Sequence, residues 1–247
     1  MSDSDSDIEL TLSANALAAL QEFKQEEQQR QEEFQKLYKQ SDEDFQNKVQ
    51  KEGMNLFKED WQLSQFWYND NTADTLARAL LEGADSETVI AVVSAPSVYA
   101  AIQKMPKEDI PTEHIYLFEF DTRFELLAGK DHFVYYDYNK PTEFESSIKG
   151  KVDRLLIDPP FLNDDCQTKS SITAKTLLAP NDKSKTQNAS LKHRLISCTG
   201  ERMHEIMFNV YPDIHITTFL PEHANGLSNE FRCYANFEWD AWKFTQV

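Results

Sequence analysis

Four consecutive residues, Asp158-Pro159-Pro160-Phe161, bring together groups that could hold an amine for reaction. The Asp158 carboxylate and the Pro159 carbonyl offer a pair of acceptors for the two hydrogens of an NH₂ group, which would orient the nitrogen lone pair. Phe161 adds a flat apolar wall that could stack on a planar base or cover the methylene stem of a lysine. An amine held in this way beside an electrophilic methyl group would react mainly through alignment, which can supply about 7–11 kcal/mol.

The residues before this tetrapeptide indicate that it is more than an ordinary turn. Leu155, Leu156 and Ile157 form a continuous aliphatic run, which is typical of a parallel strand covered on both faces. The two prolines cannot donate to a sheet ladder, so they end the strand at Asp158. Open α/β sheets bind ligands beyond the carboxyl ends of their strands. We therefore interpret the tetrapeptide as a working loop rather than as the turn that Asp and Pro favour anywhere.

Acids follow two other predicted strands as well. Three more apolar runs are predicted to be strands: Val89–Val93, His114–Phe118 and Phe133–Tyr136. Glu119, or Asp121 as the alternative, follows the second of these runs and could accept both hydrogen bonds of a ribose cis-diol. Asp137 follows the third run. Together with Asp158, these acids would form one rim at an edge of the sheet.

The chain resembles a known enzyme family at three motifs. Besides the tetrapeptide, these are Gln65-Phe66-Trp67-Tyr68 and Asn229-Glu230-Phe231-Arg232-Cys233-Tyr234. Together they are similar to the lysine methyltransferases of translation elongation factor 1A, above all to the fungal form, over about 61–237. That family was first described as N6-adenine DNA methyltransferases, because (Asp/Asn)-Pro-Pro-(Phe/Tyr) is a signature of methyltransferases acting on amino nitrogens. The resemblance implies a class I, seven-strand Rossmann-like α/β sheet, S-adenosylmethionine as methyl donor and elongation factor 1A as substrate.

The resemblance also implies roles for individual residues. It makes the loop from Asp158 to Phe161 catalytic, and it implies that Asp137 binds the adenine amino group of the donor. Residues expected to bind the donor are Ser94, Ala95, Pro96, Glu119, Asp121, Asp137 and Tyr138. Residues expected to line the donor or acceptor pocket are Gln65, Trp67, Tyr68 and Phe161. The first strand lacks the usual Gly-x-Gly loop, but small residues still permit close approach, and Ser97 is expected to cap the next helix.

The remaining pattern predicts a mostly parallel α/β sheet. Helices are expected over Thr72–Leu81, Asp164–Leu178 and Glu201–Val210, and a fifth strand over Arg194–Cys198. Ile214–Leu220 and Phe231–Phe237 have no helix between them, so we expect an antiparallel closing pair. The intervening loop, Pro221 to Glu230, is expected to shape the acceptor channel, with His223 as a surface residue rather than a base.

Composition changes along the chain and predicts its organisation. Residues 1–12 are acidic and serine-rich and are expected to be a disordered tail. Residues 13–58 are rich in helix formers and are expected to form a helical appendage. Residues 59–247 would form the methyltransferase domain, with a polar loop insertion at 179–192.

Charge narrows the choice of partner. The chain has 25 basic and 42 acidic residues, a formal net charge of −17, and no clear basic cluster large enough to bind phosphates. Nucleic-acid binding depends on such clusters, so a basic protein substrate is favoured. The three cysteines are widely spaced and indicate neither disulfides nor a metal site. With no signal peptide or membrane span in the pattern, the chain is expected to stay in the cytosol or nucleus, with the cytoplasm preferred. We also expect a monomer that does not bind membranes.

Two other functions are compatible with the Asp158-Pro159-Pro160-Phe161 loop. An N6-adenine methyltransferase on RNA or DNA would use the same acceptors for a base amino group. A non-catalytic methyltransferase-like module would keep the fold without binding the donor. The first would methylate nucleic acid in place of protein, and the second would show no donor binding by calorimetry.

Overall fold

The computed structural model describes residues 65–226 and 230–245, together with Gln25, Met54, Phe57 and Glu59. The chain divides into two compact units, Met1–Asn47 and Lys48–Val247. The predicted acidic tail and nearly all of the predicted helical appendage lie outside the described residues. The sheet and its helices belong to the second unit.

A seven-stranded sheet in the order β3-β2-β1-β4-β5-β7-β6 forms the centre of this unit. Its strands are β1 (Ile90–Val93), β2 (Ile115–Glu119), β3 (Phe133–Tyr135), β4 (Arg154–Ile157), β5 (Arg194–Gly200), β6 (His215–Ile216) and β7 (Phe231–Ala235). Strands β3, β2, β1, β4 and β5 are parallel, whereas β7 pairs antiparallel with both β5 and β6. The expected class I sheet and its antiparallel closing pair are therefore confirmed.

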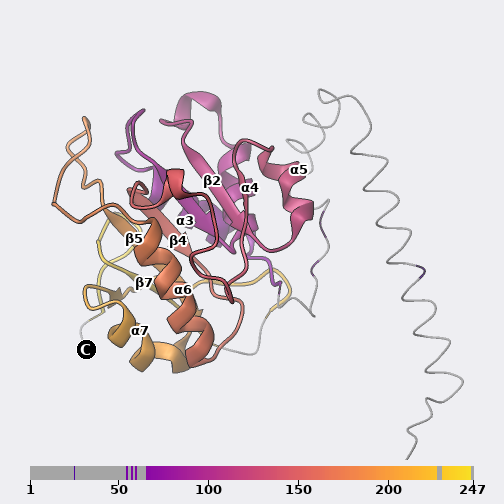
Figure 1. The fold of residues 1–247 in the computed structure, drawn as a ribbon. Helices are drawn as coiled ribbons and strands as arrows, with labels where there is room; N and C mark the ends of the chain where they lie inside the picture. Colours follow the sequence, from indigo (N-terminus) through magenta and orange to yellow (C-terminus); the bar gives the residue numbers. More distant parts are fainter. Residues whose placement is uncertain are drawn as a thin grey trace, which may run out of the picture. The chain divides into compact units, whose positions relative to one another are not determined.

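Helices cover both faces because the central strands are apolar on both. They are α3 (Asp70–Leu81), α4 (Pro96–Lys104), α5 (Glu125–Ala128), α6 (Asp164–Leu177) and α7 (His204–Val210), with short 3₁₀ turns at Lys107–Asp109, Thr122–Phe124, Ser146–Ile148 and Glu201–Met203. Figure 1 shows α6 and α7 side by side in front of the strands. Their residues share a core cluster with Ala91, Val93, Leu155 and Ile157. Alternate strand residues point the other way, where α3 and α4 pack against each other.

Two buried arginines join α3 to the sheet. Arg154 Nη1 donates to the carbonyl oxygens of Leu80 and Glu82, both at 2.7 Å. Arg194 Nη1 donates to the carbonyl of Ala79 at 2.8 Å. The last carbonyls of a helix have no partner within the helix, so these guanidinium groups satisfy groups that would otherwise be buried unpaired.

Several predicted boundaries need correction. The helix expected from Glu201 starts as a 3₁₀ turn and becomes α-helical at His204. The strand expected over Ile214–Leu220 is only two residues long, and Thr217, just beyond it, forms an isolated bridge with Phe244. Ser97 does not cap α4, because Pro96 takes the first helical position and moves the N-cap to Ala95.

The polar segment 179–192 holds one internal bridge, between Lys185 and Leu191. It packs on the loop after α3, where Thr186 Oγ1 donates to the Gly83 carbonyl and Asn188 Nδ2 to the Ala84 carbonyl. None of the helices in the described part of the chain has the length and apolar character of a membrane span. Within the same residues, no group of three His, Cys, Asp or Glu side chains is placed to hold a metal ion.

Candidate active site

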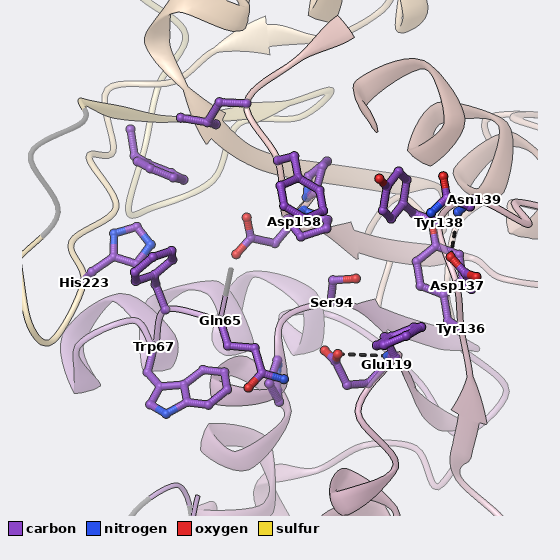
Figure 2. Close-up of a pocket in the computed structure, with 18 of the residues that line it drawn as sticks. Gln65, Trp67, Ser94, Glu119, Tyr136, Asp137, Tyr138, Asn139, Asp158 and His223 are labelled. Atoms are coloured by element: carbon purple, nitrogen blue, oxygen red, sulfur yellow. Dashed lines mark hydrogen bonds between the residues drawn. The ribbon is translucent and has the colours of Figure 1, made fainter. Parts of the chain in front are cut away.

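A cavity of about 580 Å³ opens at the carboxyl ends of the parallel strands (Figure 2). This volume lies within the range of small-molecule and cofactor sites. Most residues predicted from the sequence line it: Gln65, Trp67, Ser94, Pro96, Glu119, Asp137, Tyr138, Asp158, Pro159, Pro160 and Phe161. Three others, Tyr68, Ala95 and Asp121, are buried and are not among its lining residues.

The Asp158 loop begins where the β1–β4 ladder ends. The Asp158 N–H donates to the Val93 carbonyl at 3.0 Å, and the prolines then stop the ladder. The Asp158 carboxyl is set deep in the protein but opens onto the cavity (Figure 2). Burial raises the pKa of Asp158 to about 7; the adjacent Tyr68 hydroxyl opposes this rise and the charge of Glu119 adds to it.

Gln167 on α6 fixes the end of this loop. Its Nε2 donates to the Phe161 carbonyl at 3.2 Å and to Thr199 Oγ1 at 3.0 Å, and its side chain is buried. Gln167 was not among the residues predicted from the sequence. The buried face of α6 also carries Ser170, Ser171 and Thr173, so no local pattern singled out Gln167.

Glu119 and Asp121 have different surroundings. Glu119 Oε1 accepts from the N–H groups of Phe120 and Asp121 at 2.9 and 3.3 Å, while the carboxylate faces the cavity (Figure 2). Burial outweighs these bonds and raises the pKa of Glu119 to about 7. Asp121 is instead held by Arg123 and Gln65. Burial raises the pKa of Asp121, but hydrogen bonds and charge from Arg123 and Gln65 lower it by more. The net pKa of Asp121 is therefore below its usual value.

The loop after β1 approaches the cavity without glycine. Ser94 has φ of 56°, in the left-handed region that glycine usually occupies, and its N–H donates to the Phe118 carbonyl at 2.8 Å. Helix α4 follows, and no side chain caps its N-terminal end. The partial positive charge of that end favours an anionic group at this side of the cavity.

The opposite end of the cavity is formed by the loop after β3. The Asn139 N–H donates to Asp137 Oδ1 at 2.9 Å, and the Tyr138 ring lies 5.6 Å from the Phe161 ring. Lys169 on α6 donates to Asn139 Oδ1 at 3.2 Å and lies over the Tyr138 ring. This loop and the Asp158 loop therefore pack against each other.

An aromatic wall borders Asp158 on its other side. Tyr68 forms an antiparallel bridge with His223, and their rings lie 4.8 Å apart. The His223 ring in turn packs at 4.6 Å against Phe231. The expectation that His223 is a surface residue was wrong: it is half-buried in the wall, because pairing between 67–69 and 222–224 folds its loop inward. Burial lowers the pKa of His223 to about 4, so the ring is neutral at pH 7.

Asn229, from the third sequence motif, lies outside the described residues. Phe231, from the same motif, and Arg202, in the 3₁₀ turn before α7, line the cavity. Arg202 is the one cationic side chain among the described lining residues. The cavity thus has an acidic and aromatic interior: carboxyl groups at three strand ends, aromatic rings on both sides of Asp158, and an uncapped helix end.

Comparison with known proteins places this arrangement among characterised families. Residues 59–239 match the model of a family described as probable N6-adenine methyltransferase. The chain is 77% identical over 234 residues to protein-lysine N-methyltransferase EFM5 of Saccharomyces cerevisiae, covering 95% of this chain and 94% of that protein. It is 36% identical over 239 residues to human EEF1A lysine methyltransferase 1, covering 96% and 97%.

Among solved structures, a putative class I S-adenosylmethionine-dependent methyltransferase from Listeria monocytogenes is similar with a TM-score of 0.48 at 12% identity, over 83% of this chain and 71% of that one. The family model and the two relatives cover the same residues that form the sheet and the cavity. The chain therefore belongs to the methyltransferase family described as probable N6-adenine methyltransferase, whose relatives compared above are named as lysine methyltransferases.

Proposed function

We propose that this enzyme transfers a methyl group from S-adenosylmethionine to a lysine ε-amine of translation elongation factor 1A. The observation that carries the proposal is the Asp158 loop, which opens into a cavity of cofactor size between two aromatic groups. The names of the relatives support both the lysine and the elongation factor. We further propose that the enzyme works as a monomer in the cytoplasm.

The cavity suits S-adenosylmethionine along its length. Glu119 would accept the ribose hydroxyls, and Asp137 with Tyr138 would hold the adenine. The uncapped end of α4, next to Ser94, would receive the carboxylate of the methionine part. When bound, this donor supplies an electrophilic methyl group on a positively charged sulfur. That charge would stabilise the ionised form of Glu119.

Asp158 and its neighbours would prepare the amine. Free lysine has a pKa of about 10.4, so a proton must leave before the nitrogen can attack. Packing of the lysine stem against Phe161 would lower the pKa of the amine. Asp158, with its own pKa near 7, is suited to receive the proton. The nitrogen–methyl bond would then form as the sulfur–methyl bond breaks, with the Pro159 carbonyl helping to orient the amine.

Charge supports a protein substrate over a nucleic acid. The net charge of −17 repels phosphates. The rings of neutral His223 and Phe231 line the cavity, and such rings offer faces that attract an ammonium group. A half-buried imidazolium at this place would repel the same group.

Mass spectrometry tests the proposal directly. Purified elongation factor 1A and, in parallel, RNA and DNA are incubated with the enzyme and S-adenosylmethionine carrying a labelled methyl group. We expect label on a single lysine-containing peptide of the elongation factor and none on nucleic acid. Label on adenine alone would refute the proposal in favour of base methylation. If the enzyme binds the donor but transfers no label to elongation factor 1A, RNA or DNA, the assignment of elongation factor 1A is refuted.

A further inference from the structure

The Tyr68 hydroxyl is buried without an evident structural purpose. Tyr68 is 4% exposed, and its hydroxyl makes no hydrogen bond of ordinary geometry to any described residue. Leaving a buried hydroxyl unpaired costs folding free energy, so such a group calls for an explanation. Phenylalanine would fill the same space without this cost.

Two polar groups lie beside this hydroxyl, the Asp158 carboxyl and the Cys198 thiol. The Cys233 thiol and, after it, burial raise the pKa of Cys198 well above its usual value, so Cys198 stays a neutral thiol and a weak acceptor. Burial also raises the pKa of Tyr68, so the phenol keeps its proton and can donate it. The strong acceptor within reach is therefore Asp158.

The backbone around Tyr68 is held firmly enough to aim the hydroxyl. The Ala224 N–H donates to the Trp67 carbonyl at 2.8 Å, and the Asn69 N–H donates to the Glu222 carbonyl at 2.9 Å. The His223 ring stacks on the Tyr68 ring between these bonds. The phenol is thus fixed from both sides and cannot turn towards solvent.

We propose that Tyr68 is a positioning residue of the methyl transfer, whose hydroxyl donates to one oxygen of Asp158 and so turns the other oxygen towards the target amine. This inference depends on the proposed function, in which Asp158 holds the amine. Hydrogen bonds of this kind are often long in the free enzyme and shorten in the reactive complex. The unpaired hydroxyl beside an open carboxylate is such an incomplete arrangement.

Tyr68→Phe isolates the hydroxyl, and Tyr211→Phe is its matched control. Tyr211 is 5% exposed and its hydroxyl is likewise unpaired among the described residues, but it stands at the C-terminal cap of α7 and does not line the active-site cavity. Both changes remove one buried, unpaired hydroxyl. Both variants should therefore melt at or slightly above the temperature of the unchanged protein.

The two variants should differ in catalysis. We expect Tyr68→Phe to lower kcat by at least about tenfold, because a misdirected carboxylate aligns the amine poorly. KM for S-adenosylmethionine should stay within about twofold, and Tyr211→Phe should change neither constant. The acid limb of the kcat profile should move to higher pH in Tyr68→Phe, because the hydroxyl no longer lowers the pKa of Asp158.

Calorimetric binding of S-adenosylmethionine confirms that each variant is folded. Wild-type kcat and an unmoved acid limb in a folded Tyr68→Phe protein would overturn the positioning role. An equal loss of kcat in both variants would also overturn it, because the hydroxyls would then act only through general packing. Failure of the unchanged protein to methylate any lysine would instead refute the proposed function itself.

Discussion

Glu119 and Asp158 reach the same cavity from β2 and β4, and the charge of Glu119 raises the pKa of Asp158. Burial is the larger cause for both, and each carboxyl has a pKa of about 7. Without a bound cation, ionising both groups is unfavourable. The two carboxyl groups therefore lower the stability of the free protein at neutral pH, and a cation bound between them would offset this loss.

Glu119→Gln should stabilise the free protein at pH 8 while weakening donor binding. Glu119 has a pKa of about 7 in the folded state against an ordinary 4.5. Between pH 4.5 and about pH 7 the folded state holds a proton on Glu119 that the unfolded state has lost. The free energy of unfolding therefore falls as the pH rises through this range. The neutral glutamine avoids this loss, which amounts to at most about 3 kcal/mol.

Urea denaturation at pH 8 and at pH 4.5 measures this effect. The variant should be more stable at pH 8, and the difference should nearly vanish at pH 4.5, where the folded protein holds Glu119 protonated. Glu143→Gln, at an exposed residue paired with Lys140, serves as the control and should show no such pH dependence. If the difference in unfolding free energy between Glu119→Gln and wild type were the same at pH 8 as at pH 4.5, the raised pKa of Glu119 would be contradicted.

Asp158→Asn should separate catalysis from donor binding. The amide has nearly the same shape, but it cannot accept a proton and it presents an NH₂ group to the amine. We expect kcat to fall by about 10²–10⁴-fold. Calorimetry should give donor affinity within a few-fold of wild type, because Glu119 and Asp137 remain. Substantial activity in this variant would exclude Asp158 as the proton acceptor, and Asp182→Asn on the exposed 179–192 segment is the neutral comparison.

The rim of acids was predictable because it depends on local pattern alone. Aliphatic runs mark buried strands, and parallel strands deliver their final residues to one edge, so Glu119, Asp137 and Asp158 had to meet there. The choice between Glu119 and Asp121 could not be made from local pattern. That choice depends on the partners of Asp121. Gln65, far earlier in the chain, and Arg123, in the turn that follows, both donate hydrogen bonds to the Asp121 carboxylate.

What the sequence concealed depends on pairing between distant segments. From the sequence, His223 was expected to be a surface loop residue. The bridge that buries it is formed with Tyr68, which lies 155 positions earlier in the chain (223 − 68), so no local pattern reveals it. Gln167 likewise acts through Thr199, on a strand that follows much later. Side chains of this kind become visible only when the fold brings their partners together, because hydrophobic periodicity carries no information about them.

His223→Phe should retain most activity, whereas His223→Lys should not. Burial lowers the pKa of His223 to about 4, so above about pH 5 it acts as a neutral ring between Tyr68 and Phe231. Phenylalanine keeps that wall, and we expect kcat/KM for the protein substrate within about threefold. Lysine places a like charge beside the incoming ammonium and should cost about tenfold or more. Steady-state kinetics at pH 8 decide this, and loss of activity in His223→Phe would show that the imidazole itself takes part.

Arg154→Met should destabilise the fold far more than the removal of an exposed arginine. Arg154 is fully buried, and its guanidinium satisfies the carbonyls of Leu80 and Glu82 at the end of α3. Burial lowers the pKa of Arg154 to about 9, yet the group remains charged at neutral pH. Methionine fills much of the space but leaves these carbonyls without a donor, a loss of about 2–4 kcal/mol.

Arg78→Met is the matched control, because Arg78 pairs with Asp74 at 2.7 Å on the exposed face of the same helix. Exposed pairs of this spacing contribute little, so we expect a change below about 0.5 kcal/mol. Urea denaturation of both variants at pH 7 gives the comparison. Similar small losses in the two proteins would mean that water reaches the end of α3 once Arg154 is removed, and that the arginine does not hold α3 to β4.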